Sequence, residues 1–136
     1  MKELTVAAVV DNLDRVTDFV NEQLEMMDCP MKLQMKIAVV IDEVFSNIAK
    51  YAYPEGCGDA TILVESVNAP AGMRMTFIDR GLYYDPLQKE DPDITLGISE
   101  RQVGGLGVLM IKKLMDDIRY EYKDGQNRLT IVKYFN

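Results

Sequence analysis

A long helical segment with a single apolar side constrains the fold of this chain more than any other feature. Between Pro30 and Tyr53 the apolar residues recur at the spacing of an α-helix, and together they cover one continuous arc of its surface. Pro30 is favoured in a first helical turn, and Pro54 with Gly56 ends the pattern. A helix of this kind requires a second layer of structure against its apolar side. The residues on the arc are Ile37, Val40, Ile41, Val44, Phe45, Ile48 and Ala52.

The segments on either side of this helix supply that second layer. Alternating residues predict strands, and turns at NAPAG and at Asp124-Gly125 predict two hairpins. The sequence therefore predicts one domain over residues 1–136 with an α+β fold, a two-layer sandwich whose mixed, mostly antiparallel sheet is covered on one face by helices. Residues 80–103 show no clear period, which is typical of a functional loop. The other predicted elements are strands at Glu3–Val9, Thr61–Val67 and Met73–Asp79, helices from Asp11 or Asn12 to Met27 and from Gly104 to Ile118, and strands within residues 118–135.

Histidine is absent from the chain, which restricts the chemistry available to it. Ser-His-Asp and Cys-His catalysis, histidine-based metal sites and a phospho-accepting histidine are all excluded. The net charge of −7 argues against a nucleic-acid partner. Cys29 and Cys57 lack metal-ligand spacing and are expected to be reduced thiols in a cytoplasmic protein, and no apolar run is long enough to cross a membrane.

Three places depart from the regular pattern, and the first is on the long helix. Glu43 and Asn47 lie one turn apart on the shoulder of the apolar arc. They fit a solvated helix flank. They also fit a shared site in which Asn47 offers an oxygen to a hard cation and Glu43 offers a base.

The other two departures are a carboxylate and a run of glycines. Asp79 ends a strand on its inward face, where it is either a turn residue that accepts backbone N–H groups or an acceptor for the amino group of a ligand, with Gly81 allowing close approach. Gly104, Gly105 and Gly107 crowd the start of an apolar helix, as either a flexible turn or a cradle for phosphate. The run matches neither a Walker A loop nor a dinucleotide-binding fingerprint.

These motifs occur in an order that resembles the Bergerat ATP-binding fold: Glu43-x-x-x-Asn47, then Asp79-x-Gly81, then residues 104–107, Gly-Gly-Leu-Gly. That superfamily unites gyrase-type topoisomerases, heat-shock chaperones, histidine kinases and mismatch-repair ATPases. Over nearly its whole length the chain is most similar to the small stand-alone anti-sigma factor/serine-protein kinases of bacteria. The resemblance implies a single histidine-kinase-like ATPase domain.

The resemblance also implies a role for each motif. Asn47 would coordinate Mg²⁺ on the phosphates of ATP, Asp79 would accept a hydrogen bond from the adenine amino group, and Gly81 would lie against the base. Glu43 would be the general base that deprotonates a serine on an anti-anti-sigma (STAS) protein. The residues expected near the phosphates are Arg101, Gly104, Gly105, Leu106 and Gly107.

Two positions depart from the kinase pattern. Tyr83 stands where kinase members commonly carry the second glycine of D-x-G-x-G, and it would narrow the adenine side of the pocket or stack on the base. Tyr51 stands where many anti-sigma kinases have histidine. Nucleotide binding therefore follows more directly from the resemblance than phosphoryl transfer does.

Three functions remain open at this point. The first is an ATP- and Mg²⁺-binding serine kinase of anti-sigma type that acts on an anti-anti-sigma protein and sequesters a sigma factor, with a homodimer also open. The second is a non-catalytic module that senses nucleotide, in which residues 80–103 act as a lid and set partner affinity. The third is a degenerate scaffold that has lost nucleotide binding, for which Tyr83 is the main support.

Overall fold

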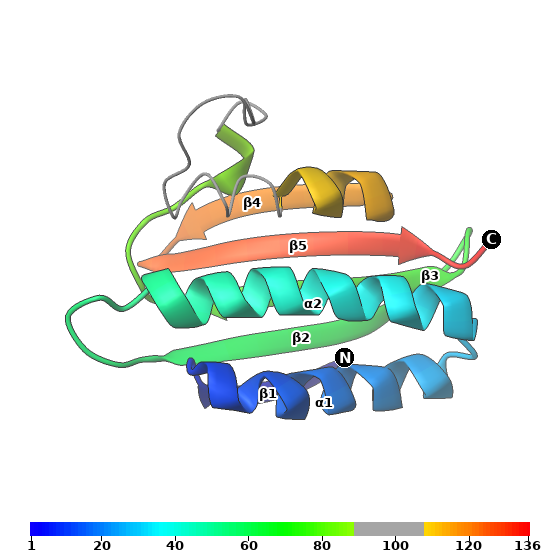
Figure 1. Cartoon of the computed structure of the whole chain (residues 1–136). Coiled ribbons are helices and arrows are strands. Elements are labelled where there is room, and N and C mark those ends of the chain that lie inside the picture. The colour runs from blue at the N-terminus through cyan, green and yellow to red at the C-terminus, as the bar shows by residue number, and fades with distance from the viewer. Residues whose placement is uncertain (89–107) are drawn as a thin grey trace, which may run out of the picture.

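The computed structural model describes residues 1–88 and 108–136. In this part of the chain α1 and α2 lie side by side across one face of a five-stranded sheet, and residues 108–114 form a helical segment above β4 and β5 (Figure 1). The strand order is β1-β2-β3-β5-β4. The elements are β1 (Lys2–Ala7), η1 (Val10–Asn12), α1 (Leu13–Met26), α2 (Met31–Tyr51), β2 (Asp59–Val67), β3 (Gly72–Asp79), η2 (Pro86–Gln88), β4 (Asp117–Lys123) and β5 (Gln126–Tyr134).

The predicted α+β sandwich with helices on one face is confirmed, with one correction to the sheet. A mixed sheet was expected, but every strand pairing among the described residues is antiparallel. The turn between β4 and β5 explains the last pairing. Asp124 and Gly125 have φ values of 54° and 74°, the left-handed backbone that a tight two-residue hairpin requires.

The core lies between the two helices and the sheet. All seven residues of the apolar arc predicted for α2 are buried, and α1 contributes Val16, Val20 and Leu24. The sheet contributes alternate residues of each strand to this core, because successive side chains of a strand point to opposite faces. Its main buried side chains are Val6, Ile62, Val64, Met73, Met75, Phe77 and Ile131.

One predicted helix boundary is confirmed and one is wrong. Asn12 occupies the N-cap position of α1 as expected, but its side chain makes no capping bond, and its amide instead donates to the carbonyl of Ala7 at 2.8 Å. The helix predicted to continue to Ile118 ends at residue 114, because the chain then joins the sheet. The backbone N–H of Asp116 donates to the carbonyl of Val132 at 2.9 Å, and β4 begins one residue later.

Both cysteines are free thiols. Cys29 is buried, and burial raises the pKa of its thiol, whereas Cys57 is exposed. Among residues 1–88 and 108–136, no helix has the length and apolar character needed to cross a membrane.

Candidate functional site

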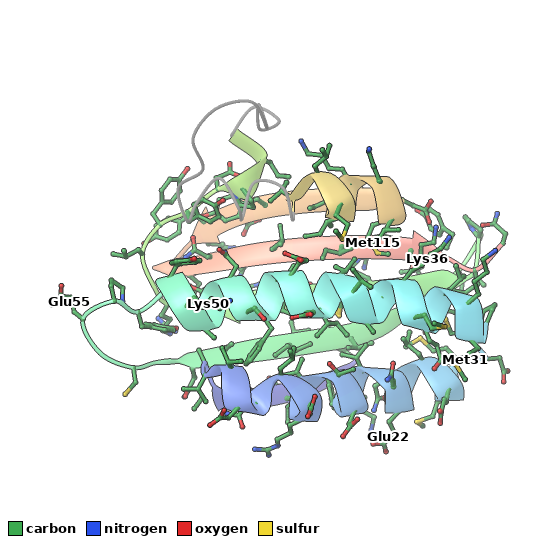
Figure 2. The ribbon with its side chains drawn as sticks, in the orientation of Figure 1. Glu22, Met31, Lys36, Lys50, Glu55 and Met115 are labelled. Carbon is green, nitrogen blue, oxygen red and sulfur yellow. The ribbon has the colours of Figure 1, made fainter. Side chains whose placement is uncertain are left out.

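A pocket lies between the C-terminal half of α2, the end of β3 and the start of β5. In Figure 2, Lys50 on α2 and Glu55 in the following loop mark this end of the molecule. The pocket has a volume of about 50 Å³ and mixes apolar walls with a few polar groups. Its lining residues are Val44, Asn47, Ile48, Ala52, Phe77, Asp79, Leu82, Tyr84, Pro86, Tyr120, Asn127 and Leu129.

A second hollow of about 30 Å³ adjoins the first one. It shares Asn47 with the first pocket and adds Glu43, together with Val108 and Ile111 from the helical segment. Glu43, Asn47 and Asp79 are therefore arranged around two adjoining hollows, with Asn47 on the wall of both. The polar shoulder of α2 therefore faces these hollows, and the roles of Glu43 and Asn47 toward a ligand stay predictions.

Tyr84 and Pro86 line both hollows, so the segment that contains them lies along the whole site. One water molecule needs a cavity volume of about 10–15 Å³, so each hollow is large enough for only a few waters. A ligand the size of a nucleotide must displace Tyr84 and Pro86 in order to span both hollows.

Asp79 is 7% exposed, and its carboxylate is held by donors from two elements. Its Oδ1 accepts the backbone N–H of Gly81 at 2.9 Å, which makes a tight turn after β3. The same oxygen accepts the side-chain amide of Asn127 at 3.0 Å. The predicted turn aspartate is confirmed, and because this residue also forms part of a pocket wall, its role as an acceptor for a ligand stays a prediction.

Asn127 is the centre of a hydrogen-bonding network that sequence reasoning missed. Its Nδ2 donates to Asp79 and to the carbonyl of Leu82 at 2.9 Å. Its Oδ1 accepts the backbone N–H of Tyr84 at 3.2 Å and the hydroxyl of Tyr120 at 2.5 Å. The network joins β3, β4, β5 and the segment after β3 at the floor of the pocket.

Gly81 is placed by close packing against the end of α2. A Cβ at this position would lie 2.3 Å from the carbonyl oxygen of Ala52, which also accepts the backbone N–H of Leu82 at 2.9 Å. Gly81 is not among the lining residues of the pocket that contains Asp79. Its expected contact with a base stays a prediction, and what the structure gives it is a packing role.

Tyr53, which lies just after α2, links this helix to β2 and β3 through hydrogen bonds of its hydroxyl. Its hydroxyl donates to the carbonyl of Asp59 at 2.7 Å, where β2 begins, and accepts the backbone N–H of Arg80 at 2.8 Å, just after β3. Burial raises the pKa of Tyr53, and the nearby carboxylates of Asp79 and Asp59 add to this shift. The hydroxyl therefore stays protonated and keeps its donor role at neutral pH.

Tyr83 lies outside the pocket, although it was expected to narrow the adenine side or to stack on the base. Its side chain is exposed, and its ring packs edge-on against Tyr122 and Tyr120, with ring centroids 5.2 Å and 6.0 Å apart. The neighbouring Tyr84 lines the pocket instead. The main support for a degenerate scaffold is therefore removed.

The remaining candidates fall elsewhere. Arg101, Gly104, Gly105, Leu106 and Gly107 lie outside the described residues. No group of three or more acidic, cysteine or histidine side chains suited to a metal occurs in the two ranges that the structure describes. Asn47 with Glu43 beside it offers only part of an oxygen shell, which fits Mg²⁺ because this ion is usually shared between one or two protein oxygens and substrate phosphates.

Comparison with known proteins identifies the family. Residues 6–133 match the model of the histidine kinase-like ATPase domain, so the chain belongs to this family, which confirms the resemblance drawn from its motifs. Two similar curated proteins are the serine/threonine-protein kinase BtrW of Bordetella bronchiseptica, 26% identical over 76% of this chain and 72% of that protein, and the serine-protein kinase RsbW of Bacillus cereus, 33% identical over 74% and 62%.

A serine-protein kinase RsbW of Listeria monocytogenes is 26% identical over 74% of this chain and 65% of its own length. The match thus spans between three-fifths and three-quarters of these relatives. A solved structure of the RsbU and RsbW domains of Rv1364c from Mycobacterium tuberculosis matches 98% of this chain and 32% of that one, with a TM-score of 0.63 at 16% identity. This likeness supports the fold.

Proposed function

We propose that this protein is an ATP–Mg²⁺-binding regulator of anti-sigma type that phosphorylates a serine of an anti-anti-sigma protein. The observation that carries the proposal is the arrangement of Glu43, Asn47 and Asp79 around adjoining hollows in a chain of the histidine kinase-like ATPase family. The similarity to serine-protein kinases supports the choice of reaction. A sigma factor is the second proposed partner, and the cytoplasm is the proposed compartment.

Each residue has a defined task in this proposal. Asp79 accepts a hydrogen bond from the amino group of adenine, and the amide oxygen of Asn47 holds Mg²⁺, which neutralises charge on the phosphates. The serine oxygen of the partner bonds to the γ-phosphorus as the bond to the β-phosphate oxygen breaks. The serine proton passes to Glu43, and ADP leaves.

The first test separates binding from transfer. The purified protein is titrated with ATP–Mg²⁺ by calorimetry and is then incubated with a candidate STAS protein, whose phosphoserine is read by mass spectrometry. Glu43→Gln should abolish transfer while the Kd for ATP stays within about threefold, because the base acts after binding. Asp79→Asn should weaken ATP by about ten- to a hundredfold, because it replaces a charged acceptor in the pocket by an amide.

Asp42→Asn is the matched control, since Asp42 is the exposed neighbour of Glu43 on α2 and accepts a hydrogen bond only from Ser46 among the interactions described for it. It should change neither readout. Persistent transfer by Glu43→Gln removes Glu43 as the base, and undiminished ATP binding by Asp79→Asn removes this pocket as the adenine site.

A second candidate function is a nucleotide sensor without catalysis, and the position of Tyr84 and Pro86 would give such a sensor a segment that responds to the nucleotide. These residues line both hollows, which are small, so we expect a bound nucleotide to change their placement. A sensor of this kind needs different contacts in its two states and no chemistry. ATP-dependent partner binding with no ADP and no phosphoserine would select this function over the kinase.

A further inference from the structure

Asn127 occupies an unusual position for an amide, because it lies on the core side of β5 directly opposite Asp79 on β3. It is 7% exposed. We propose that Asn127, held by Tyr120, is a positioning residue that sets the base selectivity of the pocket by fixing how Asp79 meets the amino group of adenine. This proposal rests on the nucleotide site proposed above.

The orientation of the Asn127 amide follows from its partners. The backbone N–H of Tyr84 can only donate, so the atom that it contacts must be the oxygen of the amide. The carbonyl of Leu82 can only accept, so the atom that it contacts must be the nitrogen. The group that faces Asp79 is therefore an N–H donor.

The hydrogen-bonding capacity of the amide is filled in this structure. A side-chain amide offers two N–H donors and two acceptor lone pairs, and Asn127 uses all four on Asp79, Leu82, Tyr84 and Tyr120. Displacement of Tyr84 by a nucleotide would free one lone pair but not the N–H group that contacts Asp79, so we expect Asn127 to act on a bound base chiefly through Asp79. Among these groups, only the Asp79 side chain is a charged acceptor on the pocket wall.

The Oδ1 atom of Asp79 is fixed as an acceptor by the same network. The backbone N–H of Gly81 and the Asn127 amide both donate to this oxygen, so it acts as an acceptor. The carboxylate thus accepts a local bond from the turn and a bond from a residue 48 positions away in the sequence. Without Asn127, it loses the bond that comes from the neighbouring strand.

Tyr120 stabilises the orientation of the amide from the far side. Its hydroxyl donates to Oδ1 of Asn127. Burial raises the pKa of Tyr120 to about 12, with the nearby Tyr83 and Asp85 adding to the shift, so the hydroxyl keeps its proton at neutral pH. If the amide were flipped, its N–H groups would face two other donors, the hydroxyl of Tyr120 and the backbone N–H of Tyr84. The pair with the backbone N–H of Tyr84 could not form a hydrogen bond.

An oriented carboxylate discriminates between bases by what they present to it. Adenine carries an amino group at position 6, whereas a purine with hydrogen at that position has no N–H donor there for the carboxylate. A site built around a polar group rejects an analogue that leaves this group unpaired. A hydrogen bond to a charged group corresponds to a preference of about ten- to a hundredfold.

The test measures a ratio of affinities. The Kd values of ATP and of purine riboside triphosphate, which lacks the 6-amino group, are measured by calorimetry with Mg²⁺ for the wild-type protein and for Asn127→Ala, Tyr120→Phe and Thr130→Val. Thr130 is the matched control, because it lies on β5 three residues from Asn127 and its hydroxyl contacts Thr76 on a different face of the sheet.

The wild-type protein should prefer ATP by about tenfold or more, and Asn127→Ala should lower this ratio by about fivefold or more while the Kd of the analogue changes by less than about threefold. Tyr120→Phe should lower the ratio in the same direction by a smaller factor, and Thr130→Val should preserve it. Tyr120→Phe keeps the test decisive if Asn127→Ala does not fold.

Two results would contradict these proposals. If Asn127→Ala and Tyr120→Phe weaken both nucleotides by one common factor, or leave the ratio unchanged, the residues are structural and the inference fails while the nucleotide site stands. If the wild-type protein binds neither nucleotide, the proposed function itself fails.

Discussion

Replacing Gly81 by alanine tests the packing that places Asp79. The added Cβ would lie 2.3 Å from the carbonyl oxygen of Ala52 and 2.6 Å from its Cβ. The first of these atoms belongs to the backbone at the C-terminal end of α2, so it cannot rotate away as a flexible side chain would. The turn after β3, the end of α2 or both must move.

The expected cost follows from these contacts. Forcing an extra carbon into a packed site costs about 1–3 kcal/mol, and the bond from Leu82 to the same Ala52 carbonyl contributes about 0.5–1.5 kcal/mol. The two effects together predict a loss of about 1.5–4.5 kcal/mol in the free energy of unfolding. For a domain of this length, each kcal/mol corresponds to about 4 °C in Tm, so Gly81→Ala should lower Tm by about 6–18 °C.

Thermal unfolding followed by far-UV circular dichroism measures this loss. Gly56→Ala is the control, because a Cβ at Gly56 meets no atom within 4 Å, and its free energy of unfolding should change by less than about 1 kcal/mol. ATP titration of the folded fraction gives a second readout, since Gly81 also donates to Asp79. Equal melting temperatures for the two variants would refute the close approach of Gly81 to Ala52.

Three further outcomes are expected. Tyr53→Phe removes two hydrogen bonds at the junction of α2, β2 and β3 and should lower the free energy of unfolding by about 1–2 kcal/mol, as urea denaturation would measure; an unchanged midpoint would contradict it. In hydrogen exchange, ATP–Mg²⁺ should speed exchange of the Tyr84 amide, which bonds to Asn127, because a nucleotide must displace this segment; slower exchange would count against displacement. The raised pKa of Tyr120, about 12 in the folded state against 10 in its reference state, predicts stability that is complete below pH 10 and is lost as pH rises toward 12, with a weaker loss in Tyr120→Phe.

The fold could be predicted from local periodicity, because the long helix and the hairpins each carry their own pattern. The buried arc of α2 and the turn at Asp124-Gly125 are examples of this. The prediction failed where one residue fits two patterns. Ile118 continues the apolar stripe of a helix, yet it also alternates correctly in a strand, and only the pairing of β4 with β5 decides between them.

The site could be predicted only in the parts that depart from a local rule. Asp79 was found because a carboxylate on the inward face of a strand is unusual. Asn127 stands on the inward face of β5 in the same way, at a position that alternates with Leu129 and Ile131, and this pattern could have revealed it. Its role could not be inferred, because its pairing with Asp79 depends on a strand register that links distant parts of the chain.

The geometry also explains why two proposed functions share one site. Asn47 lines both hollows and Glu43 only the second one, so a nucleotide held at Asp79 and Asn47 would occupy the first hollow whether or not transfer follows. Displacement of Tyr84 and Pro86 would accompany binding in either case. Among the described residues, the two proposals assign different tasks only to Glu43, so in Glu43→Gln the nucleotide-dependent change in partner affinity should persist while phosphoserine disappears. Loss of both together would mean that Glu43 is needed to form the site itself.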